Sequence, residues 1–211
     1  GLLASMFKAG LGIEIPATFP RMTYREAEDI YRSDKPDTRY DMKIIDLGEV
    51  FAATEFKIFR STLDGGGVVR AINAKGFASV TTGQMNRLNE IAIQAGLPVK
   101  TLAFIKLENG EYKSPLWKIF TDAEKEAVVA KLNLEEGDIV FFAAGKRESV
   151  STILGRVRVE IADMMGLVKD STAFNFLWVV DFPLLAHDEE SGHWVAVHHP
   201  FTRPNPEDVG K

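Results

Sequence analysis

Apolar positions recur along the chain at the spacing of helices and strands, with turn residues between them. Residues 2–11 carry an apolar stripe at helical spacing, which predicts an amphipathic helix that packs against another part of the structure. Thr23 with Glu26 three residues later has the pattern of a capping box, so a helix is expected over residues 24–31. The turn-rich stretch 33–37 would end that helix.

From about residue 54 the pattern changes to short strands alternating with helices. Residues 55–60 alternate like a strand, Asp64-Gly65-Gly66-Gly67 is typical of a hairpin turn, and residues 68–73 would be the returning strand. Further helices are expected over 81–95, 122–132 and 149–165, further strands over 101–107 and 139–143, and a tight turn at Asn109-Gly110. This order predicts an α+β fold: a two-layer β-β-α-β-β-α domain with one additional helix.

The C-terminal part has a different pattern. Residues 176–182 and 193–198 are expected to be strands of a hairpin, joined by the acidic loop 187–192. The first 46 residues and the last 40 or so are each too short for a core of their own. We therefore expect two strips of one scaffold, residues 1–47 and 173–211, with a complete domain inserted over residues 48–172.

Composition narrows the function classes. The chain has 211 residues, no cysteine and a formal net charge of −5, so disulfides are excluded and a general nucleic-acid clamp is disfavoured. No apolar run approaches the roughly 20 residues that a membrane span needs. All four histidines fall in the last 25 residues, but without the spacing of a zinc site, so no metal site is expected.

Several strings closely resemble bacterial aspartyl-tRNA synthetases, and they occur in the right order and at suitable spacing. They are residues 19–28 (FPRMTYREAE) followed by 31–39 (YRSDKPDTR), then 178–183 (WVVDFP) and 198–202 (HHPFT). The segment between them resembles the GAD domain shared with the B subunit of the tRNA-dependent amidotransferase. The resemblance covers essentially the whole chain. One departure is Arg32, where the family usually has glycine, which puts the local turn geometry in question.

The resemblance implies a class II synthetase built on an antiparallel sheet. Such an enzyme activates aspartate with ATP and magnesium, transfers it to tRNA, works in the cytoplasm and is typically a homodimer. It also implies that His198 lies near the substrate aspartate, with His199 as its companion. The family's ATP-binding motifs are not found in this sequence. We therefore expect an internal fragment that is inactive alone, holds no catalytic residue and binds no cofactor.

The charged turn after residue 33 and the pair of adjacent histidines each allow two interpretations. Asp34, Lys35, Asp37 and Arg39 form a charged turn that either contacts tRNA or the active-site rim, or is a salt-bridged turn that holds the helix end. The pair His198-His199, taken without the family, is more often structural than ligand-binding. On a strand the two side chains would face opposite sides, and Pro200 would hold His199 extended.

Two other functions would suit parts of this pattern. A stand-alone RNA- or protein-docking module would fold its flanking strips onto the domain as part of one core. A part of an amidotransferase subunit would share the GAD-like segment, but the string HHPFT at residues 198–202 argues against it because it resembles the synthetase active site.

Overall fold

The computed structural model of the chain describes residues 1–169, 173–188, 191–197 and 206–209. Its helices and strands are α1 Leu2–Leu11, β1 Arg21–Thr23, α2 Tyr24–Tyr31, β2 Ile45–Asp46, α3 Lys57–Asp64, β3 Val68–Ala74, α4 Thr82–Gln94, β4 Ala103–Glu108, β5 Glu111–Lys113, η1 Leu116–Lys118, α5 Asp122–Leu132, β6 Ile139–Gly145, α6 Arg147–Met165, β7 Trp178–Val180, β8 Leu185–His187, β9 Trp194–Ala196 and η2 Pro206–Asp208. No helix of the described residues is long and apolar enough to span a membrane.

The centre of the molecule is a five-stranded antiparallel sheet with strand order β2-β3-β6-β4-β5. β3 and β6 are paired along their full length, from Val68 opposite Gly145 to Ala74 opposite Ile139. All seven residues of β3 are buried, because both of its faces are covered. The mixed α/β class with an antiparallel sheet is therefore as predicted.

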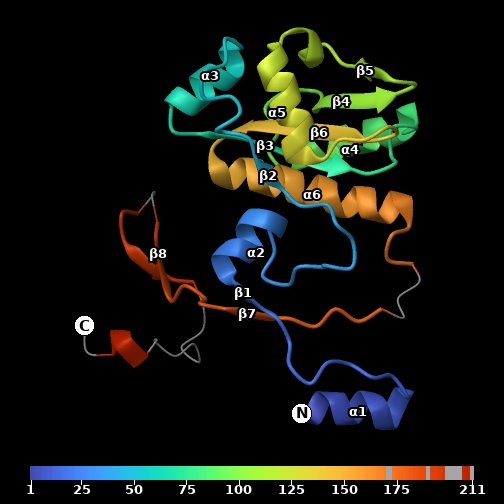
Figure 1. Cartoon of the computed structure of the whole chain (residues 1–211). Helices are drawn as coiled ribbons and strands as arrows, with labels where there is room; N and C mark the ends of the chain where they lie inside the picture. The colour runs from blue at the N-terminus through green and yellow to red at the C-terminus, as the bar shows by residue number, and fades with distance from the viewer. Residues whose placement is uncertain (170–172, 189–190, 198–205, 210–211) are drawn as a thin grey trace.

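Helices cover both faces of this sheet, so the two-layer arrangement predicted from the sequence is wrong (Figure 1). One core cluster lies between the sheet and helices α4 and α6, and includes Ile72, Leu88 and Ile153. The other lies under α3 and α5 and includes Val69, Phe59 and Val128. The physical reason is in β3 and β6: the apolar residues of β6 run continuously, and those of β3 are interrupted only by Arg70 and Asn73 and do not alternate with polar ones, as in strands buried on both faces.

The segment predicted as a first strand, residues 55–60, is the start of helix α3. Ile58 on its outer side is 60% exposed, whereas Phe59 is buried against the rings of Phe51 and Phe120. The predicted hairpin at residues 64–67 is wrong for the same reason: these residues end a helix and lead into β3. Gly67 is needed there because a Cβ would lie 2.7 Å from the Gly145 carbonyl oxygen.

The stronger sequence signals are confirmed. α2 begins at the predicted capping box of Thr23 and Glu26, and α4 and α5 lie where helices were predicted. Asn109 and Gly110 both have positive φ and form the tight turn between β4 and β5. α6 buries Ile153, Val157 and Ile161 and ends at Gly166, which has φ +67°.

The two strips meet at a pair of strands that the sequence did not indicate. β1 and β7 pair in parallel, with Arg21 opposite Trp178, so residues 176–182 are not the hairpin partner of residues 193–198. The hairpin instead joins β8 and β9. The predicted long strand stops after β7, where Asp181 has φ +58° and Pro183 cannot donate a ladder hydrogen bond.

The strips differ in how they contact the domain. Met42 and Ile44 are buried in the core cluster under α6, and β2 joins the sheet, although these residues precede the boundary expected at residue 47. No described residue of the C-terminal strip belongs to either core cluster. α1 buries none of its residues; its Phe7 packs edge-on against Phe174 and Phe176 of that strip.

Candidate functional site: the junction between α2 and α6

The charged turn and its helix α2 lie against α6, and we call the contacts of residues 28–42 with β3 and α6 the junction. Thr23 caps the start of α2: its hydroxyl accepts a hydrogen bond from the Glu26 amide, and the Thr23 amide donates to the Glu26 carboxylate at 2.8 Å. α2 ends at Arg32, which has φ 53° and ψ 47°. This left-handed conformation favours glycine and costs a side-chain-bearing residue roughly 1–2 kcal/mol.

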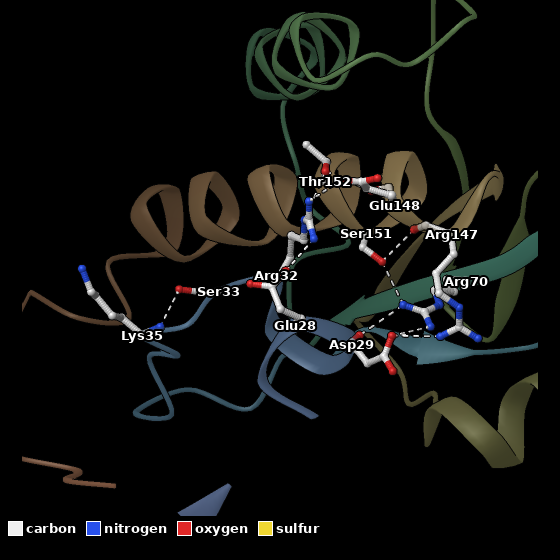
Figure 2. A network of polar contacts seen from close by, with 10 residues as sticks. All are labelled: Glu28, Asp29, Arg32, Ser33, Lys35, Arg70, Arg147, Glu148, Ser151 and Thr152. Atoms are coloured by element: carbon white, nitrogen blue, oxygen red, sulfur yellow. Dashed lines mark hydrogen bonds and ion pairs between the residues drawn. The ribbon is translucent and has the colours of Figure 1, made fainter. Parts of the chain in front are cut away.

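Arg32 gains contacts that a glycine would lack. Its guanidinium donates to Glu28 at 2.5 Å, to Thr152 at 3.2 Å and to Glu148 at 3.3 Å, so it connects the end of α2 to the first turns of α6 (Figure 2). Gly155 of α6 makes room for it: a Cβ at Gly155 would lie 2.7 Å from the Arg32 Cβ. The departure from the family pattern therefore keeps the turn and adds a link to α6.

A second arginine joins the junction from the sheet. Arg70 of β3 is 3% exposed and donates to the Asp29 carboxylate at 3.0 Å, to the Asp29 carbonyl oxygen at 3.3 Å and to the Ser151 hydroxyl at 2.9 Å. Arg147 donates to the same Asp29 carboxylate at 2.8 Å (Figure 2). Burial tends to raise the pKa of Asp29, but the hydrogen bonds from Arg70 and Arg147 outweigh it and hold that pKa below its usual value.

The third arginine, Arg158, is 2% exposed and holds the segment after the charged turn. Its guanidinium donates at 2.7 Å to each of three oxygens: the Met42 carbonyl, the Tyr40 hydroxyl and the Asp37 carbonyl. It also lies 4.1 Å from the centre of the Tyr40 ring. Burial lowers the pKa of Arg158. Burying a cation costs less when it is hydrogen-bonded, and here each of the three guanidinium nitrogens donates to an oxygen.

The residues predicted for the charged turn come together only in part. The Asp37 carboxylate pairs with Arg39 at 2.6 Å, and this hydrogen bond lowers the pKa of Asp37, as expected for a salt-bridged turn. Asp34 and Lys35 are exposed, and the Lys35 amide donates to the Ser33 hydroxyl at 3.0 Å. His198 and His199 lie outside the described residues.

A cavity of about 740 Å³ lies beside the junction, and we call it the α6 groove. The charged turn lines it on one side and α4 on another, while α6 runs along it. Among the described residues, no group of three or more His, Asp or Glu side chains gathers that could hold a metal ion. The contacts of the junction hold α2 and residues 37–42 against β3 and α6.

Sequence reasoning singled out Arg32 but not its contacts with α6, and it missed Arg70, Arg158 and Gly155. A signal was present for Arg70, which stands inside the apolar run 68–72, and for Arg158, which falls on the same helix face as Leu154 and Ile161. A charged residue on an apolar face is either paired or misplaced. Its partners could not be named, because they lie far away in the sequence.

The sequence is similar to a known domain family and to several known proteins. Residues 59–154 match the family model described as the GAD domain. The aspartate–tRNA(Asp/Asn) ligase of Opitutus terrae is 46% identical over 213 residues, which cover 99% of this chain and 36% of that protein. The aspartate–tRNA ligase of Enterococcus faecalis is 45% identical over 100% of this chain and 35% of that protein. The aspartate–tRNA(Asp/Asn) ligase of Aquifex aeolicus is 38% identical over 100% of this chain and 34% of that protein.

By class, the chain is thus a protein whose residues 59–154 match a GAD domain, with further residues on both sides of that match. The similarity continues through both strips, well beyond residues 59–154. Over its whole length the chain is similar to one segment of aspartate–tRNA ligases. It spans about a third of the length of the relatives it matches.

Proposed function

We propose that this chain is part of an aspartate–tRNA ligase, which activates aspartate with ATP and then transfers it to tRNA. The similarity through both strips carries this proposal, since relatives at 45–46% identity over almost the whole chain are named for that reaction. A GAD domain alone would also suit an amidotransferase subunit or a stand-alone docking module. Neither alternative explains why residues outside 59–154 match ligases as well.

The proposal extends to the substrates and the setting of the whole enzyme. Aspartate, ATP and tRNA would be its substrates, magnesium would support the activation step, and the enzyme would work as a homodimer in the cytoplasm. The family resemblance supports these features. No described residues gather into a carboxylate or histidine set that fits magnesium, so we assign no step to a metal held by these residues.

We propose that His198, with His199 beside it, contacts the substrate aspartate. Aspartate and asparagine have nearly the same shape, so an enzyme must separate them by charge and hydrogen-bond polarity. An imidazole beside the carboxylate supplies a donor that a neutral amide would use poorly. For Asp34, Lys35, Asp37 and Arg39 we propose a place at the active-site rim or against tRNA; the exposure of Asp34 and Lys35 supports it.

Aspartate-dependent exchange of pyrophosphate into ATP tests the proposed function. We expect the full-length enzyme to catalyse exchange with aspartate and not with asparagine. The purified 211-residue chain should give no exchange above a blank preparation, because the family's ATP-binding motifs are not found in this sequence. Absence of exchange in the full-length enzyme would contradict the function, and exchange by the short chain would contradict the placement of ATP chemistry outside it.

His198→Ala in the full-length enzyme tests the aspartate contact. A charge-assisted hydrogen bond contributes about 1.5–3 kcal/mol, so kcat/KM for aspartate should fall by roughly 10- to 150-fold with an unchanged melting temperature. His187→Ala is the matched control, since His187 lies on β8 against the Trp194 ring. Unchanged aspartate kinetics in His198→Ala, with a loss in His199→Ala, would move the role to His199.

A further inference from the structure

The α6 groove has a charge that differs from that of the whole molecule. Five cationic side chains line it, against three acidic ones, in a chain of net charge −5. The cations are Arg32, Lys35, Arg87, Arg156 and Arg158, and the acids are Asp37, Glu160 and Asp163. A cavity with a local excess of positive charge attracts anions although the chain as a whole repels them.

Two of these cations are free to meet a ligand. Arg32 is paired with Glu28, Arg87 is paired with Glu160, and Arg158 has used all its nitrogens within the junction. Lys35 and Arg156 are both exposed, and neither makes an ion pair with any residue that the structure describes. They approach the groove from different elements, Lys35 from the charged turn and Arg156 from α6.

We propose that the α6 groove binds the sugar–phosphate backbone of RNA, with phosphates at Lys35 and Arg156. Phosphate contacts come from such exposed Lys and Arg side chains, and they position an RNA without reading its sequence. The aromatic residues that line the groove, Tyr31 and Tyr40, have the guanidinium of Arg158 over their rings, so base stacking is not favoured. The proposal rests on the proposed function, in which the RNA is the tRNA substrate.

The groove also contains an element that opposes binding. Asp163 lines it and makes no ion pair with a described residue, so its negative charge would repel a phosphate. Removing that charge should therefore have the opposite effect to removing Lys35 or Arg156. A pair of changes with opposite signs separates a contact in this groove from a general loss of structure.

Steady-state aminoacylation by the full-length enzyme tests the proposal. Arg156→Gln and Lys35→Gln should each raise KM for tRNA by about twofold to fivefold, the range of one exposed ion pair. Each should also make log KM less steep in log salt by roughly one phosphate contact. Asp163→Asn should lower KM for tRNA by up to about twofold. Arg156→Gln should leave the tRNA-independent pyrophosphate exchange at its wild-type rate.

Lys57→Gln is the matched control. The substitution removes the same charge, but Lys57 is exposed on α3, which lies on the opposite face of the sheet. It should leave KM for tRNA unchanged. A wild-type KM in Arg156→Gln, or an equal increase in Lys57→Gln, would overturn the groove proposal while normal exchange leaves the ligase function standing. If Arg156→Gln and Lys35→Gln weakened the binding of an acidic peptide and left the binding of tRNA unchanged, the RNA proposal would also be overturned, in favour of a protein partner.

Discussion

At the scale of single residues, the most informative position is Arg32. Its left-handed backbone is the conformation for which the family's glycine is suited, so the turn at the end of α2 keeps its geometry with a less suitable residue. The backbone cost is offset by contacts with Glu28, Glu148 and Thr152. These contacts are possible only because α6 has no Cβ at Gly155, so positions 32 and 155 depend on each other.

The dependence predicts the outcome of Gly155→Ala. In most helices this change stabilises by about 1 kcal/mol, but here the new Cβ would lie 2.7 Å from the Arg32 Cβ, so overpacking should dominate. We expect the free energy of unfolding to fall by roughly 1–3 kcal/mol in urea denaturation.

Two further variants make this test specific. Gly83→Ala is the matched control, since a Cβ there meets nothing within 4 Å in α4, and it should be neutral or stabilising. Adding Arg32→Gly to Gly155→Ala should restore most of the loss, because it removes the clash and the unfavourable backbone together. No loss in Gly155→Ala, or no rescue by Arg32→Gly, would contradict the proposed contact.

At the scale of elements, the sequence identified those whose signals are local. The capping box at Thr23 marks the start of α2, and Asn109-Gly110 marks a hairpin. The structure shows two further capping boxes, at Thr81 and Thr121, where helices were predicted without them. These signals depend on hydrogen bonds within a few residues, so they survive in almost any tertiary context. The apolar face of α6 was equally clear, because Ile153, Val157 and Ile161 recur at helical spacing.

The elements that were missed depend on distant partners. In α3, Phe59 and the partly buried Leu63 face the core at helical spacing, but the short segment 55–60 also alternates, and no capping side chain marks its start. The pairing of β1 with β7 joins residues more than 150 positions apart. Period and turn chemistry do not encode such a contact, which is why a hairpin was expected there instead.

The candidate site divides in the same way. The charged turn could be located from residues 33–39, and its Asp37–Arg39 ion pair follows from their closeness in sequence. The groove beside it could not, because its other sides come from α4 and α6. Arg156 and Arg158 are only two residues apart, yet one is exposed and the other buried. Helical spacing places Arg158 on the apolar face of α6, but its partners in residues 37–42 appear only in the packed structure.

At the scale of the whole molecule, buried arginines of β3 and α6 hold the N-terminal strip against the central sheet and α6. Arg70 and Arg158 hold Asp29 and the segment 37–42, and the Ile44 amide donates to the Ile30 carbonyl at 2.9 Å. The C-terminal strip touches this unit less, through β7 and residues near α2. Together these contacts predict three levels of protection from local opening.

Hydrogen–deuterium exchange of the 211-residue chain tests this claim most directly. Amides of β3 and β6 should exchange slowest, and those of residues 30–44 next. Amides of α1, β8 and β9 should exchange fastest, because these three elements bury none of their residues. In Arg158→Met, residues 30–44 should exchange about tenfold faster or more, because three acceptors lose their donor, while β3 and β6 keep their order. Arg156→Met, two residues away and exposed, should change nothing. Unaltered exchange of residues 30–44 in Arg158→Met, or equal protection of β8–β9 and β3 in the wild type, would contradict the account.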